Sequence, residues 1–60
     1  MTKEKVLAYA IEVFGSTQKA ERWLTKAKKE FGGESPMAQL EKGNTNEVRK
    51  LLDRVANGYF

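Results

Sequence analysis

The 60-residue sequence predicts an all-α fold, a compact bundle of four helices of which the third is short. Apolar residues recur at intervals of three and four, the spacing that places side chains on one face of a helix. Gly15, Ser35-Pro36 and Gly43 separate these periodic segments and are typical of helix ends and helix starts. Strands are not expected, because no segment of useful length alternates apolar and polar residues.

The first two helices are expected over residues 3–14 and 17–29. The apolar stripe of the first comprises Val6, Leu7, Ala10, Ile11 and Phe14. Gly15 is expected to end this helix in a left-handed conformation, and Ser16 to cap the next one. The apolar stripe of the second helix comprises Ala20, Trp23, Leu24 and Ala27. Trp23 lies in the middle of that stripe, so we expect it in the core, where an aromatic ring contributes most.

The third helix is expected at residues 36–42 and the fourth after Asn44. Ser35 can cap the third helix, and Pro36 at its first position has its φ angle already fixed. Asn44 followed by Glu47 resembles a capping box, with Asn in place of Ser or Thr. The apolar stripe of the fourth helix comprises Val48, Leu51, Leu52, Val55 and Tyr59.

Length and composition predict one domain over residues 1–60 that is not an enzyme and holds no cofactor. The chain has no Cys and no His, which removes disulfides, most zinc sites and the commonest general acid–base group. The eight Asp and Glu residues are scattered beside Lys or Arg and are expected to be solvated surface acids. A core this small is marginally stable, so association with a partner protein or in a homo-oligomer is expected.

The same composition predicts a cytoplasmic protein. No apolar run approaches the roughly 20 residues of a membrane span, and no membrane association is expected. The charged start of the chain leads into an amphipathic pattern rather than a signal-peptide apolar stretch. The absence of Cys gives no indication of an oxidising compartment.

A run of basic residues on the second helix gives an alternative function. The net charge is +3, and Lys19, Arg22, Lys26 and Lys29 recur at a spacing that would place them on one helical face. Such a face could contact phosphates or an acidic partner, although a solvated surface is the commoner explanation. The alternative is therefore a small nucleic-acid-binding or regulatory oligomerisation module, with nucleic acid the less favoured partner for this chain alone.

The C-terminal end is less well explained by packing than the rest of the chain. Asn57-Gly58 marks the end of the fourth helix and leaves Tyr59 and Phe60 as an aromatic tail. Chain ends tend to fray unless something holds them. The two aromatic side chains are expected either to pack back on the domain or to insert into a pocket of a partner.

The order of these short motifs resembles the toxin-binding domain of Xre/MbcA/ParS-type antitoxins. The resemblance extends over residues 8–60, and its ordered combination is more specific than any single piece. Its pieces are Ala10 with Val13-Phe14-Gly15-Ser16, Lys19-Ala20 with Trp23-Leu24, Phe31-Gly32-Gly33 with Ser35-Pro36, Leu40, Gly43, Val48, Leu51-Leu52, Arg54-Val55 and Gly58-Tyr59-Phe60. The family usually has Leu at the position of Phe31 and often Pro-Asn in the spacer at residues 27–29.

This resemblance implies a small helical bundle that binds a RES-domain toxin, an enzyme that consumes NAD. In that family the C-terminal end of the antitoxin reaches the entrance of the active site and blocks it. The toxin-binding residues implied here are Arg54, Asn57, Gly58, Tyr59 and Phe60. Family members usually also carry an N-terminal helix-turn-helix domain, for which this chain has no room, so we expect a stand-alone or excised toxin-binding module.

Overall fold

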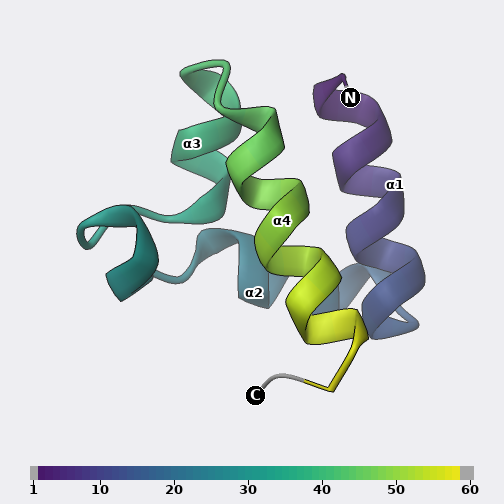
Figure 1. Ribbon diagram of the computed structural model, residues 1–60. Coiled ribbons are helices and arrows are strands. Elements are labelled where there is room, and N and C mark those ends of the chain that lie inside the picture. Colours follow the sequence, from purple (N-terminus) through teal and green to yellow (C-terminus); the bar gives the residue numbers. More distant parts are fainter. Residues whose placement is uncertain (1, 59–60) are drawn as a thin grey trace.

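Four α-helices form the part of the chain that the structure describes, residues 2–58 of a computed structural model (Figure 1). A single turn of 3₁₀-helix, η1, lies between the second and third helices, and these residues contain no strand. The elements are α1 (Lys3–Phe14), α2 (Thr17–Thr25), η1 (Lys29–Phe31), α3 (Pro36–Glu41) and α4 (Thr45–Ala56). The predicted fold class, an all-α bundle with a short third helix, is confirmed.

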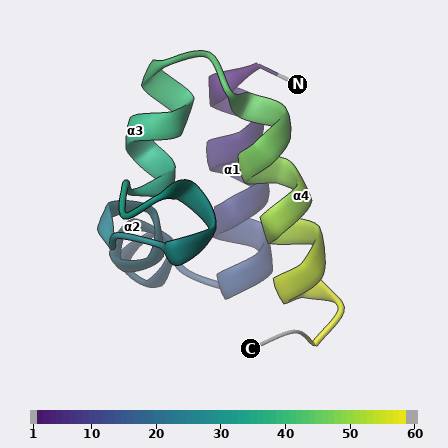
Figure 2. The same cartoon turned by 60° about the vertical axis from the view of Figure 1, so that its left-hand side comes forward.

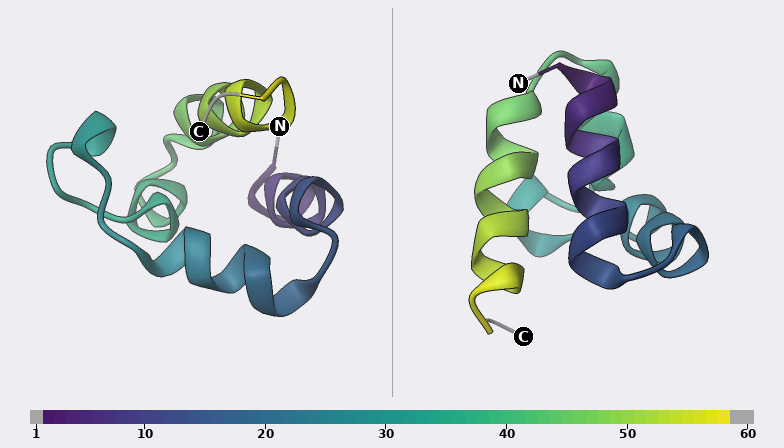
Figure 3. Two further views of the ribbon diagram at one scale, coloured as in Figure 1. Left: turned by 90° about the horizontal axis from the view of Figure 1, so that it is seen from below. Right: turned by 90° about the vertical axis from the view of Figure 1, so that its right-hand side faces the viewer.

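The helices enclose one core. α1 contacts α2 and α4, and α3 contacts the same two helices, so the four form a closed ring when viewed end-on (Figure 3, left). α1 and α4 lie side by side and run in the same direction, while α2 lies crosswise on the side of the ring opposite α4 (Figures 1 and 3). This arrangement brings the C-terminal ends of α1 and α4 to the same end of the molecule.

The predicted start and stop residues form the helix ends. The Ser16 hydroxyl accepts a hydrogen bond from the N–H of Lys19 at 3.1 Å, and the Ser35 hydroxyl accepts one from the N–H of Ala38, also at 3.1 Å. Both bonds satisfy N–H groups that have no partner within the helix. Gly15 has φ 80°, a left-handed conformation that side chains resist, and it turns the chain from α1 into α2.

The predicted capping box at Asn44 and Glu47 is wrong, because Asn44 makes no side-chain capping bond. Its amide instead donates to the side-chain oxygen of Gln39 at 2.9 Å. Gln39 is only 8% exposed, and its own amide donates to a Glu34 carboxylate oxygen at 2.5 Å. The other Glu34 oxygen pairs with Lys42. A buried amide without hydrogen-bond partners is costly, so the Asn44 side chain bonds to Gln39 rather than capping α4.

α2 ends at Thr25, so its predicted extension to residue 29 is wrong. The hydroxyl of Thr25 donates to the carbonyl oxygen of Glu21 at 2.8 Å, and Lys26 is already extended with φ −86° and ψ 139°. Hydroxyl groups that bond to the backbone in this way compete with continuation of a helix. Ala27, predicted in the apolar stripe of α2, is exposed in the extended segment that follows.

A small apolar core holds the ring of helices together. Its buried members are Val6, Ala10, Ala20, Leu24, Leu40, Val48 and Leu52. Trp23 is half-buried rather than central: its ring lies 5.7 Å from that of Phe14, and the Lys28 ammonium lies 5.2 Å from its centroid. Ile11, predicted in the apolar stripe of α1, is 38% exposed.

One polar contact joins α1 to α4 across the edge of this core. The Tyr9 hydroxyl donates to Asp53 Oδ1 at 2.5 Å, and Arg49 donates to Asp53 Oδ2 at 3.0 Å. Asp53 was expected to be a solvated acid, but it is half-buried and both of its carboxylate oxygens are bonded. The hydrogen bond to Asp53, together with burial, raises the pKa of Tyr9 above its ordinary value.

Replacing the central leucine should remove most of the stability. Leu52 is fully buried between α1 and α4, so Leu52→Ala should cost about 2–5 kcal/mol. Domains of this size have about 3–9 kcal/mol in total. Urea unfolding followed by the fluorescence of the sole tryptophan, Trp23, measures the change. Ile11→Ala is the control and should cost about 1 kcal/mol or less; equal losses for both variants would contradict this core.

The stability that the Tyr9 hydrogen bond contributes should be lost at alkaline pH. A raised pKa in the folded state means that the bond contributes fully below pH 10, the ordinary Tyr value, and is lost as pH rises through the folded-state value. Tyr9→Phe should therefore lower the free energy of unfolding by about 1 kcal/mol at pH 7. The difference from wild type should shrink above pH 10; a difference constant to pH 11 would contradict the assignment.

Candidate functional site

The C-terminal end of α4 is exposed at Arg54, Asn57 and Gly58. The N–H of Asn57 donates to the carbonyl oxygen of Asp53 at 3.1 Å, and the N–H of Gly58 donates to that of Val55 at 3.0 Å. Gly58 has φ 91°, so the chain leaves the helix through a left-handed turn. This ordered turn extends beyond the neighbouring helices and points away from the core (Figures 1 and 2).

The predicted toxin-binding residues therefore fall into two groups. Arg54, Asn57 and Gly58 lie together on the last turn of α4 and the turn that follows it. Tyr59 and Phe60 lie outside the described residues. The residues of the first group lie together because they are close in the sequence. The structure shows in which direction this end of the molecule points (Figure 1). The binding role of both groups stays a prediction.

The predicted basic face does not exist as one helical surface. Lys19 and Arg22 lie on α2, whereas Lys26 follows the end of that helix and Lys29 begins η1. All four side chains are exposed. The prediction of a single face is wrong because it required a helix that continued to residue 29. Contact of these residues with phosphates or with an acidic partner stays a prediction.

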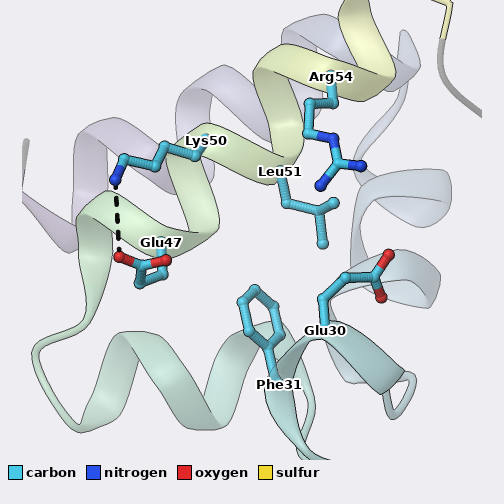
Figure 4. A pocket seen from close by; sticks show the side chains of 6 residues that line it. All are labelled: Glu30, Phe31, Glu47, Lys50, Leu51 and Arg54. Carbon is cyan, nitrogen blue, oxygen red and sulfur yellow. Dashed lines mark ion pairs between the residues drawn. The ribbon is translucent and has the colours of Figure 1, made fainter.

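A hollow of about 420 Å³ lies beside Arg54, between η1 and α4 (Figure 4). Phe31 and Leu51 supply its apolar surface, and Leu51 is only 6% exposed. The Arg54 guanidinium and the Glu30 carboxylate face each other across its rim (Figure 4). Glu47 and Lys50, an ion pair of 3.8 Å, line the far side. The candidate site is thus an exposed helix end next to a partly apolar hollow.

The loop around η1 fixes the position of Phe31 in this hollow. The N–H of Lys28 donates to the carbonyl oxygen of Glu34 at 3.0 Å. The N–H of Gly33 donates to the carbonyl oxygen of Lys28 at 2.9 Å. Gly32 and Gly33 have φ 65° and 91°, conformations that the tight turn requires. No spacing in the sequence relates Phe31 to α4, so the sequence does not predict this hollow.

Within residues 2–58, no three His, Cys, Asp or Glu side chains gather where they could hold a metal ion. None of the helices in the same part of the chain combines the length and the apolar character that crossing a membrane requires.

Comparison with known proteins gives the family. Residues 10–58 match the family described as the antitoxin Xre/MbcA/ParS C-terminal toxin-binding domain. The chain is also similar to a protein named Antitoxin Xre from Pseudomonas putida, with 42% identity over 55 residues. This match covers 90% of the chain but 35% of the relative, so the chain spans about a third of that protein's length. None of the solved structures gives a significant match.

The family match and the relative agree with the residues described above. The matched range, 10–58, contains the turn at Gly15, the loop around η1 and the exposed end of α4. The resemblance found from the ordered motifs is confirmed, and so is the prediction that the chain is not an enzyme, because the family consists of toxin-binding domains. The chain belongs to the Xre/MbcA/ParS C-terminal toxin-binding domain family.

Proposed function

We propose that this chain neutralises a RES-domain toxin, an enzyme that consumes NAD, by covering its active site. The end of α4 and residues 59–60 form the blocking element. The observation that carries the proposal is the exposed end of α4, with Arg54, Asn57 and Gly58, in a domain whose family binds toxins. The class of toxin comes from the family resemblance, in which the C-terminal end reaches the entrance of the active site.

Steric occlusion needs no catalytic group, only a shaped end that a partner can enclose. The left-handed turn at Gly58 directs the chain out of the helix. Arg54 places a guanidinium on the same exposed end, a planar group whose geometry suits carboxylates at protein interfaces. Aromatic and Arg side chains are also the residues that contribute most at protein interfaces. Tyr59 and Phe60 add two aromatic rings directly after this turn.

The hollow beside Arg54 supports the same surface. Phe31 and Leu51 offer an apolar patch next to the charged helix end, with Glu30 on the rim (Figure 4). Interfaces combine an apolar centre with a polar rim, and this surface has both. The proposal places the encounter in the cytoplasm, where a toxin that consumes NAD would find its substrate. Association of the chain with itself stays a separate prediction.

Removing the tail should separate inhibition from folding. A chain that ends at Gly58 should keep the helicity of the wild type but bind a RES-domain toxin about 30-fold more weakly or worse. This estimate assumes that the two aromatic side chains together contribute about 2 kcal/mol or more at the interface. Calorimetry gives the affinity, and circular dichroism gives the helicity.

The comparison variant is Lys19→Ala, which tests the alternative surface by removing an exposed charge from α2. Its affinity for the toxin should stay within about twofold of wild type, because isolated surface substitutions contribute little. Unchanged affinity after removal of residues 59–60 would contradict the blocking role of the tail. Loss of affinity in the comparison variant as well would move the binding surface to α2.

A further inference from the structure

The polar contact between α1 and α4 continues to the exposed end of α4. Asp53 receives the Tyr9 hydroxyl at 2.5 Å and Arg49 at 3.0 Å on its two carboxylate oxygens. The carbonyl oxygen of the same Asp53 accepts both the backbone N–H of Asn57 at 3.1 Å and its side-chain amide at 2.7 Å. One residue thus connects the middle of α1 to the turn from which the tail departs.

Packing alone gives this end of α4 little support. Leu52 is fully buried, but no residue after it is buried within the described part of the chain, and only Asp53 and Val55 are half-buried. Helix ends with few buried contacts open locally at small free-energy cost. The hydrogen bond of Tyr9 to Asp53 therefore acts where the apolar core has already ended.

We propose that Tyr9, acting through Asp53, is a positioning residue for toxin binding: it holds the last turn of α4 in the orientation from which Asn57, Gly58 and the tail meet the toxin. This inference rests on the proposed function. A partner that encloses a pre-ordered end loses less conformational entropy on binding than one that must first order it. Tyr9 lies on another helix, so its effect on affinity comes through α4.

A purely structural role for Tyr9 predicts a different result. If the bond only stabilises the fold, its removal lowers the free energy of unfolding but leaves the affinity of the folded molecules unchanged. If the bond positions α4, affinity falls even at a temperature where every molecule is folded. The two roles are separated by comparing Tyr9→Phe with a variant of similar stability whose lesion lies elsewhere.

Ser35→Ala is that matched variant. It removes the 3.1 Å cap on the N–H of Ala38 at the start of α3 and should lower the stability to an extent similar to Tyr9→Phe. At a temperature where circular dichroism shows both variants folded, Tyr9→Phe should bind a RES-domain toxin about fivefold more weakly than wild type. Ser35→Ala should stay within about twofold. Amide hydrogen exchange at residues 55–58 of the free protein should accelerate in Tyr9→Phe only.

A double-mutant cycle tests whether Tyr9 acts on the tail. In a chain that ends at Gly58, Tyr9→Phe should have a smaller effect on affinity than in the full chain, because part of what it positions is gone. Equal affinity losses for Tyr9→Phe and Ser35→Ala, or unchanged exchange at residues 55–58, would overturn the positioning role while leaving the proposed function intact. Failure of the wild-type chain to bind any RES-domain toxin would overturn the proposed function, and this inference with it.

Discussion

Burial of Leu52 and its neighbours between α1 and α4 is the interaction on which the rest of this structure depends. The chain has no Cys and no His, so neither a disulfide nor a zinc site assists a core of only a few fully buried side chains. Val6, Val48 and Leu52 have no exposed surface, and they keep the two helices side by side. This packing sets the direction in which the end of α4 points.

The same core explains why the surface proposed to bind the toxin lies at a helix end. After Leu52, α4 leaves the core but continues for another turn, and the contact of Asp53 with Tyr9 on α1 supports it there. The loop around η1 places Phe31 against the flank of α4 and forms the hollow beside Arg54. An occluding domain needs such a protruding end more than it needs catalytic chemistry. A small helical ring can therefore perform the proposed function.

Much of the fold could be predicted because its helix ends depend on local chemistry. The residues that begin and end these helices bond only to backbone groups a few positions away. The structure places them as predicted at Gly15, Ser16 and Ser35-Pro36. The end of α2 was missed because the hydroxyl of Thr25 interrupts a pattern that remains periodic beyond it. The bond from Tyr9 to Asp53 spans 44 residues, and no spacing in the sequence indicates it. Contacts between distant segments depend on how the helices pack, and the spacing of residues in one sequence does not reveal that packing.

Titration of the NAD consumption of a RES-domain toxin with the purified chain tests the central claim most directly. If the domain covers the active site, activity should fall in proportion to added chain and reach its minimum at a fixed ratio, and the two proteins should co-elute as one complex. Full activity at a large excess of chain, with no complex across several such toxins, would contradict the account. A complex that forms but leaves the toxin active would show that the domain binds a surface away from the active site.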